Sequence, residues 1–323
     1  MTQLRLSRFR VEELTSSNAA MQRCLQLALL AARSDIPVLI LGRTGTGKTL
    51  LAQAIHNSSA RAAGPFIAFN ASAMSDTLLE SLLFGHERGA FTGAQQTAKG
   101  KFELAHNGTL FLDEIADMSP LAQVKILRAV EYGEFERVGG ERMLHSDARI
   151  LSATNCSLRE RVRDGRFRDD LYHRLDGLVL SVPSLKDRPE DLPSLIASEL
   201  KTAAAESGKR LTSIHPAAMQ MLLAYDWPGN LRELHHIMRT IALFCEGSVV
   251  RPEHVVFQRD LVSDAALGDP AGRLSADLSL EAAVNAHVLH VYESTGHNQR
   301  RTAKILGISR GKLARHLSAA VPK

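Results

Sequence analysis

Residues 37–49 read PVLILGRTGTGKT, an apolar run that leads directly into a glycine-rich segment ending in a lysine and a threonine. Residues 42–49 fit the phosphate-binding pattern G-x-x-x-x-G-K-[ST], in which a buried strand passes through a glycine loop into a helix. Glycines let backbone N–H groups turn inward and cradle phosphate oxygens. The alternative, a glycine-rich turn without a ligand, is disfavoured because the strand, the lysine and the threonine are all in place.

This pattern assigns a chemical role to each part of the segment. We expect Lys48 to reach the β and γ phosphates of ATP and the Thr49 hydroxyl to bind Mg²⁺. The helix that follows would direct its positive N-terminus at the same anion. The predicted nucleotide-binding residues are Gly42, Thr44, Gly45, Thr46, Gly47, Lys48, Thr49 and Leu50.

A second apolar run, GTLFLDEI (108–115), ends in two carboxylates, Asp113 and Glu114. Doubly wound sheets bind their ligands at the carboxyl ends of the strands. Asp113 is therefore expected to bind Mg²⁺ together with Thr49, and Glu114 to be the base that polarises the attacking water. An Asp-Glu pair after a strand is often only a helix cap, but the phosphate-binding pattern makes that reading the weaker one.

Five short apolar runs alternate with helical patterns over residues 15–184, at 37–42, 65–70, 108–114, 148–154 and 177–182. This alternation predicts an α/β fold with a parallel five-stranded sheet between two helical layers. Ser119 and Pro120 are placed to begin one of the helices, over 119–133. The predicted domains are an N-terminal extension (1–13), an α/β ATPase subdomain (14–184), a helical lid without strands (185–258), a linker (259–279) and a basic helical domain (280–323).

Composition excludes several classes of protein. The 323 residues are 45% hydrophobic and 23% charged, with a net charge of +4 that does not name a partner. Three cysteines, far apart in the sequence, argue against a disulfide framework or a zinc site. The N-terminal segment has no apolar core, so we expect no signal peptide, and no apolar run approaches the ~18 residues of a membrane span. We therefore expect a cytoplasmic protein with no membrane partner.

Six motifs occur in a characteristic order: GRTGTGKT, ESLLFGHERGAFTGA, GTLFLDEI, RVGG, FRDDLYHRL and WPGNLREL. In this order and spacing they resemble bacterial sigma-54-dependent activators of the NtrC type. These are AAA+ P-loop ATPases, also called enhancer-binding proteins. The resemblance covers residues 14–258 closely and 281–317 more loosely. Many members of the family have glutamate directly after the lysine, whereas this chain has Thr49. Threonine is the residue that P-loop proteins in general have at this position.

The resemblance implies further residues of the ATPase site. Asn155 is expected to sense the γ-phosphate, and Asn70 to pair with Glu114 and switch it off between turnovers. Arg168 and Arg174 match arginines that the family presents across a subunit interface, where they offset charge that develops on the γ-phosphate. Judged by charge spacing alone, both arginines would more often be solvated helix residues.

Arg232, in the WPGNLREL motif, matches the sensor arginine of the helical lid. The alternative is a helix-face arginine that pairs with Glu233. Arginines that act in trans imply a homo-oligomer, and we expect dimers that assemble into a hexameric ring. Trp227 is expected to be lid core.

GAFTGA, residues 89–94, puts an aromatic ring between glycines. Glycine gives this backbone freedom, so Phe91 and Thr92 are expected at an exposed tip. In the resembled family the loop contacts the sigma-54 factor of RNA polymerase, and ATP hydrolysis moves it. The alternative is a surface turn whose ring folds back on its own helix. The predicted partner-binding residues are Gly89, Ala90, Phe91, Thr92, Gly93 and Ala94.

The last block is basic, with seven lysines and arginines against two glutamates over 281–323. Its pattern predicts a helix-turn-helix, similar to the Fis-type domain of the family, that binds upstream enhancer DNA. Gly311 within the second helix costs ~1 kcal/mol of helix propensity. A charged, solvated helix is the alternative. The predicted DNA contacts are Arg300, Arg301, Ser309, Arg310, Lys312 and Arg315.

Only about fourteen residues precede the ATPase, so the chain resembles the sensorless subgroup, which includes the phage-shock and Hrp activators. Control is then expected to come from the expression level or from a separate inhibitory or partner protein. Two other functions were weighed: a DNA-binding repressor with a vestigial ATPase, and a general AAA+ remodeller. The intact Lys48, Asp113 and Glu114 argue against the first, and the 89–94 loop argues against the second.

Overall fold

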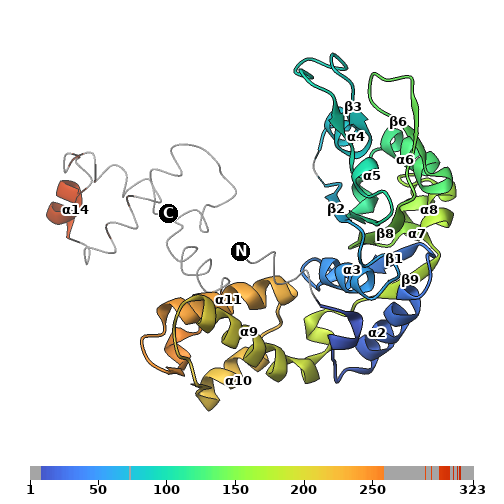
Figure 1. Cartoon of the computed structure of the whole chain (residues 1–323). Helices are drawn as coiled ribbons and strands as arrows, with labels where there is room; N and C mark the ends of the chain where they lie inside the picture. Colours follow the sequence, from blue (N-terminus) through green and yellow to red (C-terminus); the bar gives the residue numbers. More distant parts are fainter. Residues whose placement is uncertain are drawn as a thin grey trace. The chain divides into compact units, whose positions relative to one another are not determined.

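The computed structural model describes residues 9–72 and 74–257 and, nearer the C-terminus, residues 288, 292, 298–305, 308, 311 and 313. The chain divides into two compact units, Met1–Val255 and Val256–Lys323. Figure 1 shows the sheet and its helices in the first unit. No helix within the described ranges combines the length and the apolar character that a membrane crossing requires.

Five parallel strands form the central sheet, as the sequence predicts. In spatial order they are β2 (Phe66–Asn70), β5 (Thr109–Asp113), β8 (Arg149–Thr154), β1 (Val38–Leu41) and β9 (Leu178–Ser181). Each strand lies within one residue of the predicted bounds at either end. All strands run in one direction, so their carboxyl ends, with the motifs that follow them, meet at a single edge of the sheet.

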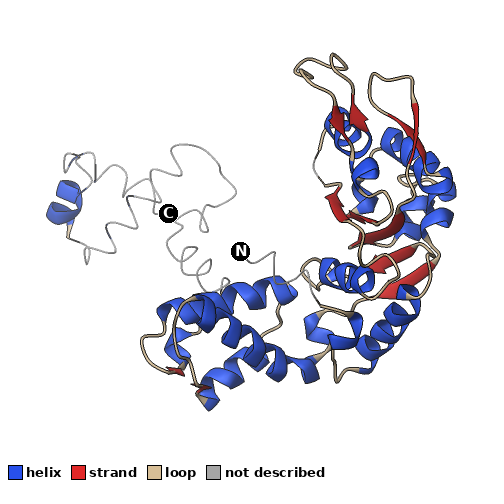
Figure 2. Cartoon of the chain, viewed as in Figure 1, coloured by secondary structure: helices blue, strands red, loops and turns tan. Residues whose placement is uncertain are grey.

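Helices cover both faces of this sheet, as Figure 2 shows. Side chains of β5 alternate between the faces: Leu110 and Leu112 belong to one buried cluster and Phe111 to the other. The cluster around Phe111 contains residues of α2 (Ala19–Ala32) and α3 (Lys48–Asn57). The other side is covered by α4 (Asp76–Phe84), α5 (Lys101–Leu104), α6 (Pro120–Tyr132), α7 (Leu158–Arg163) and α8 (Asp169–Leu175).

Helix α6 begins and ends where the sequence predicts. The Ser119 side chain accepts a hydrogen bond from the N–H of Ala122 at 3.3 Å, and Pro120 is the first helical residue. Gly133 ends the helix in the left-handed conformation, with φ of 71°.

Two hairpins extend beyond the sheet on the α4 and α6 side. One pairs β3 (Gly85–His86) with β4 (Ala98–Lys99), and the other pairs β6 (Glu134–Glu136) with β7 (Met143–His145). Their tips project side by side at the top of Figure 1, and an isolated bridge between His86 and Val138 joins them. The 89–94 loop is the tip of the first hairpin.

The lid consists of α9 (Leu192–Glu206), α10 (Pro216–Ala224) and α11 (Asn230–Phe244). Short 3-10 turns complete the first unit: η1 (Val11–Glu13), η2 (Ile115–Asp117), η3 (Leu185–Asp187), η4 (Pro189–Asp191) and η5 (Pro252–His254). Trp227 is buried in the lid core, as expected, and its indole N–H donates to the carbonyl of Leu222 at 3.0 Å.

The prediction of a lid without strands is wrong in one detail. Ser213–Ile214 (β10) and Val249–Val250 (β11) form a two-stranded parallel ladder. A strand of two residues is too short to show the alternation by which a strand is recognised in a sequence.

Within the second unit the structure describes α14 (Gln299–Ile305) and a few further residues. Ala303 and Leu313 are buried together with Val288, and Ile308 packs against them. The predicted linker (259–279) and the second helix of the helix-turn-helix, apart from residues 311 and 313, lie outside the described residues, so both stay predictions.

Candidate functional site: a phosphate loop beside two carboxylates

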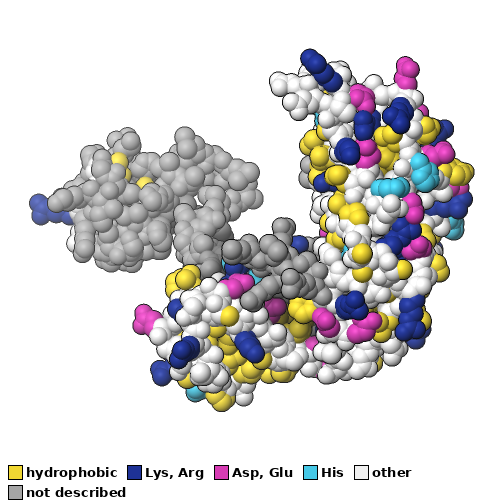
Figure 3. All heavy atoms as spheres, in the orientation of Figure 1, with side chains coloured by type: hydrophobic (Ala, Val, Ile, Leu, Met, Phe, Trp, Pro, Cys, Tyr) yellow, Lys and Arg dark blue, Asp and Glu magenta, His cyan; other side chains and the backbone are white. Residues whose placement is uncertain are grey.

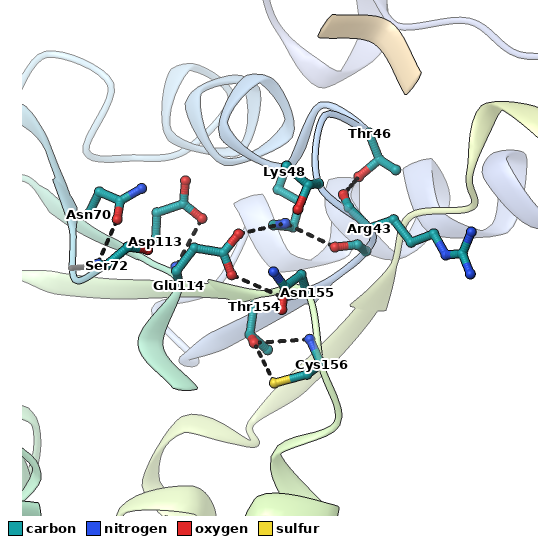
Figure 4. Close-up of polar contacts among 12 residues, drawn as sticks. Arg43, Thr46, Lys48, Asn70, Ser72, Asp113, Glu114, Thr154, Asn155 and Cys156 are labelled. Atoms are coloured by element: carbon teal, nitrogen blue, oxygen red, sulfur yellow. Dashed lines mark hydrogen bonds and ion pairs between the residues drawn. The ribbon is translucent and has the colours of Figure 1, made fainter. Parts of the chain in front are cut away.

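The phosphate loop connects β1 to α3 at the carboxyl edge of the sheet. Gly45 and Gly47 have φ of 79° and 101°, the left-handed region that glycine tolerates without a Cβ clash. Lys48 is the first residue of α3 and only 6% exposed. Its ammonium group donates to the carbonyl of Gly42 at 2.9 Å and to Oε1 of Glu114 at 3.3 Å (Figure 4). A buried cation therefore lies at the base of the loop.

The two carboxylates lie next to this lysine. Asp113 ends β5, and its Oδ1 accepts the N–H of Glu114 at 3.0 Å. Burial raises the pKa of Asp113 above its ordinary value, and the charge of Glu114 raises it further. The charge of Lys48 lowers this pKa and so offsets part of the increase. Glu114 has a left-handed backbone, with φ of 52°. Such backbone conformations cost energy in residues other than glycine and cluster at functional sites.

Asn155, after β8, completes this group. Its backbone N–H donates to Oε2 of Glu114 at 3.2 Å, so the two Glu114 oxygens are held by Lys48 and by Asn155. Asn70 lies on the neighbouring strand, in register with Asp113. Its Oδ1 accepts the N–H of Ser72 at 2.8 Å, as Figure 4 shows. The pairing of Asn70 with Glu114 is not among the contacts of the described residues and stays a prediction.

The residues present fit a nucleotide with Mg²⁺. The positive-φ glycines turn N–H groups inward, Lys48 supplies a buried positive charge, and Asp113 is a carboxylate that burial makes costly to ionise without a cation. The exposed Thr49 hydroxyl lies one residue after Lys48. Hydroxyl and carboxylate oxygens are the ligands that Mg²⁺ prefers.

The lid brings Arg232 to this site. A Cβ built on Gly45 would lie 3.3 Å from Cβ of Arg232, and the charge of Arg232 acts on Asp113. Glu233 does not support the alternative reading, because its carboxylate accepts the N–H of Gly229 at 2.7 Å and the Tyr225 hydroxyl at 2.8 Å.

Arg168 and Arg174 lie on the surface, away from the contacts of the phosphate loop. Arg168 caps the start of α8 and pairs with Asp170 at 2.7 Å, and Arg174 pairs with Glu131. Both side chains are about half exposed. Their action across a subunit interface stays a prediction.

The 89–94 loop is closed by a backbone hydrogen bond, and its side chains differ in exposure. The N–H of Gly89 donates to the carbonyl of Ala94 at 2.8 Å, which closes the loop. Thr92 is exposed, as expected. Phe91 requires a correction, because it is half-buried and its ring lies edge-on to His86 at 5.0 Å between centroids. The ring folds onto the base of its own hairpin rather than onto its helix.

The hairpin of β6 and β7 supports this loop through contacts that we did not derive from the sequence. Gly139 has φ of 76°, and a Cβ there would lie 2.7 Å from Cβ of Ala90. Arg137 joins Glu87 at 2.8 Å to Glu103 at 2.7 Å. The RVGG motif, residues 137–140, contains the arginine and the glycine that make these contacts, so it is the sequence signal that could have indicated them.

For the predicted DNA contacts the structure gives little. Arg300 is exposed on α14. The Arg301 side chain and the four other predicted contacts lie outside the described residues: Ser309, Arg310, Lys312 and Arg315. On the face drawn in Figure 3, basic and acidic side chains of the first unit are interspersed.

Comparison with known proteins identifies the family. Residues 14–181 match the sigma-54 interaction domain, and residues 186–264 match an AAA+ ATPase lid domain. The Nif-specific regulatory protein of Enterobacter agglomerans is 41% identical over 95% of this chain and 59% of its own length. For the transcriptional regulatory protein ZraR of Escherichia coli, the identity is 41% over 94% of this chain and 68% of the relative.

Solved structures agree with this match. NtrX from Brucella abortus, crystallised in complex with ATP, aligns with a TM-score of 0.75 and 33% identity over 99% of this chain and 71% of its own. The chain thus spans 59% to 71% of the length of these three proteins. It belongs to the family of AAA+ proteins with a sigma-54 interaction domain.

Proposed function

We propose that this chain is an ATP-driven activator of transcription by the sigma-54 form of RNA polymerase. It would hydrolyse ATP and use the energy to remodel a closed promoter complex into an open one. The observation that carries the proposal is the contact of Glu114 with both Lys48 and Asn155, because it gathers the phosphate loop, the base and the sensor at one point. Membership of the sigma-54 interaction domain family supports the choice of partner.

The side chains suggest how hydrolysis proceeds. Lys48 binds Glu114 in this structure, and a nucleotide phosphate would compete for the same ammonium group. Once Lys48 turns to the phosphate, Glu114 is free to accept a proton from the attacking water. Asp113 and Thr49 would hold Mg²⁺, whose charge offsets that of the phosphates. Asn155, whose backbone N–H donates to Glu114, would respond to the γ-phosphate.

The 89–94 loop is proposed as the element that binds the sigma-54 factor. Its glycines are open to solvent, and Thr92 is exposed at the tip. The proposal includes a ring, in which Arg168 and Arg174 act on the nucleotide of the neighbouring subunit. ATP hydrolysis per subunit should then rise steeply with protein concentration. Activity that stays constant down to the monomer would rule the ring out.

DNA binding by residues 280–323 is also a proposal, supported by the excess of basic residues in this block. Deletion of 280–323 should abolish binding to an upstream site and leave ATP hydrolysis intact. Binding by the intact chain should weaken steeply with salt. A truncated chain that keeps full affinity for the site would refute this assignment.

The direct test is open-complex formation in vitro with sigma-54 polymerase, with and without ATP. The intact chain should open the promoter only with ATP, and Lys48→Ala should not open it. We also propose a cytoplasmic location and a separate regulatory partner. A chain that is active alone in this assay and is silenced by a second protein would support the partner.

A further inference from the structure

The lid contacts the phosphate loop through the carbonyl groups of that loop. Asn230, the first residue of α11, is 1% exposed, and its Nδ2 donates to the carbonyl of Thr44 at 3.0 Å. Arg188, between η3 and η4, is 5% exposed, and its Nη2 donates to the carbonyl of Thr46 at 3.5 Å. Two buried donors outside the α/β core therefore hold two alternate carbonyl groups of the loop.

Because the peptide unit is rigid, holding a carbonyl group of the loop also fixes the direction of the N–H group that follows it. In a planar trans peptide unit, the C=O and the following N–H point in opposite directions. A Thr44 carbonyl that points to Asn230 therefore turns the N–H of Gly45 the other way, and the Thr46 carbonyl does the same for Gly47. None of the residues that the structure describes accepts a hydrogen bond from either N–H. Both N–H groups are oriented and available for an anion.

Asn230 is suited to this position for two further reasons. Its Oδ1 accepts the N–H of Leu185 at 2.7 Å, so one amide group joins the phosphate loop to the segment that begins the lid. Its φ is 53°, a left-handed conformation that asparagine adopts more readily than most residues. The carbonyl of Gly229, one residue earlier, would lie 2.2 Å from a Cβ on Gly45, so lid and loop are in direct contact.

Arg188 is energetically unfavourable at its buried position. Its Nε is buried and has no hydrogen-bond partner among the residues that the structure describes. Burial lowers the pKa of this guanidinium, and the charge of Asp191 partly opposes that effect. A buried arginine with an unsatisfied donor is destabilising by itself, and such groups call for an explanation other than stability.

We propose that Asn230 and Arg188 are positioning residues that turn the N–H groups of Gly45 and Gly47 into the phosphate cradle. The inference rests on the proposed function, because it takes a nucleotide phosphate as the ligand of the loop. A docked lid then preorganises the loop for the β-phosphate. A displaced lid removes both donors from the carbonyl groups, so the N–H groups lose their orientation and the phosphate is released more easily.

Asn230→Asp tests this inference with a minimal change. It keeps an oxygen acceptor for Leu185 and the tolerance for positive φ, but it places a carboxylate oxygen against the carbonyl of Thr44. Asn107→Asp is the matched control, because Asn107 also has positive φ, 59°, and is exposed at the start of β5. Arg188→Met is a second variant that removes the other donor and keeps a long side chain.

Calorimetric titration with ADP and AMP separates positioning from general damage. ADP places a β-phosphate in the cradle and AMP does not, so Asn230→Asp should weaken ADP binding ~10-fold or more. Binding of AMP should change by no more than about twofold, because AMP lacks the β-phosphate that the N–H groups of Gly45 and Gly47 are proposed to hold. Arg188→Met should show the same selective loss, to a smaller extent because its contact is longer. Asn107→Asp should change neither affinity.

In steady-state hydrolysis, the KM for ATP should rise in Asn230→Asp while kcat at saturation changes little, since Lys48 and Glu114 are untouched. Equal losses for ADP and AMP, or unchanged ADP affinity in both Asn230→Asp and Arg188→Met, would overturn the inference. An intact chain that binds neither nucleotide would instead refute the proposed function. If Asn230→Asp fails to fold, Arg188→Met decides between these outcomes.

Discussion

The phosphate loop and the 89–94 loop are both rich in glycine, yet different forces shape them. Gly45 and Gly47 have φ of 79° and 101°, and Gly89 and Gly93 have φ of 85° and 107°. Lid atoms crowd the first pair, whereas a Cβ on either residue of the second pair would meet nothing within 4 Å. The first loop is shaped by packing, which suits a ligand bound in one geometry. The glycines of the second loop have open space around them, which leaves room for a partner outside the chain.

The largest effect is expected at the base of the phosphate loop. Lys48→Ala should abolish nucleotide binding, because it removes the charge that holds the β and γ phosphates. Glu114→Ala should bind ATP and fail to hydrolyse it, which separates binding from chemistry. Fluorescent-nucleotide titration and phosphate release measure the two steps. Normal turnover by the Glu114 variant would show that another residue is the base.

The difference in packing between the two loops predicts that a glycine-to-alanine substitution has unequal effects in them. A Cβ at Gly45 would lie 2.2 Å from a lid carbonyl, so Gly45→Ala must displace the lid as well as strain the backbone. We expect loss of ATP hydrolysis and a clear fall in Tm. Gly93→Ala should cost only the ~1–2 kcal/mol of a left-handed alanine and leave hydrolysis unchanged. Equal Tm shifts for the two variants would contradict the distinction between packed and free loops.

Phe91→Ala examines the partner-binding role of the second loop. The ring is half-buried against His86, so its loss should cost at most about 2 kcal/mol, against ~3–5 kcal/mol for a fully buried phenylalanine. ATP hydrolysis should persist, because its groups lie at the other loop. Capture of the sigma-54 factor in the presence of ADP–aluminium fluoride, and promoter opening, should both be lost. Undiminished opening by this variant would leave the loop without its proposed role.

The smallest effect concerns the arginine that supports this loop. The hydrogen bond from Arg137 lowers the pKa of Glu103, so this pair stabilises the fold above the ordinary glutamate pKa and less as pH falls through the lowered value. Arg137→Gln should cost roughly 1 kcal/mol at neutral pH. It should cost nothing once both carboxylate partners of Arg137, Glu103 and Glu87, are protonated in both chains. Urea unfolding at neutral pH and at an acid pH below the lowered pKa of Glu103 measures the difference. A cost independent of pH would mean that the arginine acts only by packing.

Much of the α/β subdomain was predictable because its signals are local. Each of the five apolar runs became a strand of four to six residues. The central strands β5, β8 and β1 are buried on both faces, so no polar side interrupts their runs. Lys48, Asp113 and Glu114 each follow a strand that the sequence shows, and parallel strands bring their ends together. The exposure of Phe91 was predicted less well. The ring of His86 lies five residues away in sequence, and no periodicity indicates the contact between the two rings.

The sequence by itself determined the five strands of the central sheet, the phosphate loop, its carboxylates and the motif that identifies the family, because each depends on neighbouring residues. Only the tertiary structure decided which groups hold the loop in shape. Asn230 lies 186 residues from Thr44 along the chain, and the contact exists because α11 packs its N-terminus against the α/β subdomain. A hydrogen bond between a side chain and a distant carbonyl leaves no pattern in the sequence, since any residue can supply the carbonyl group.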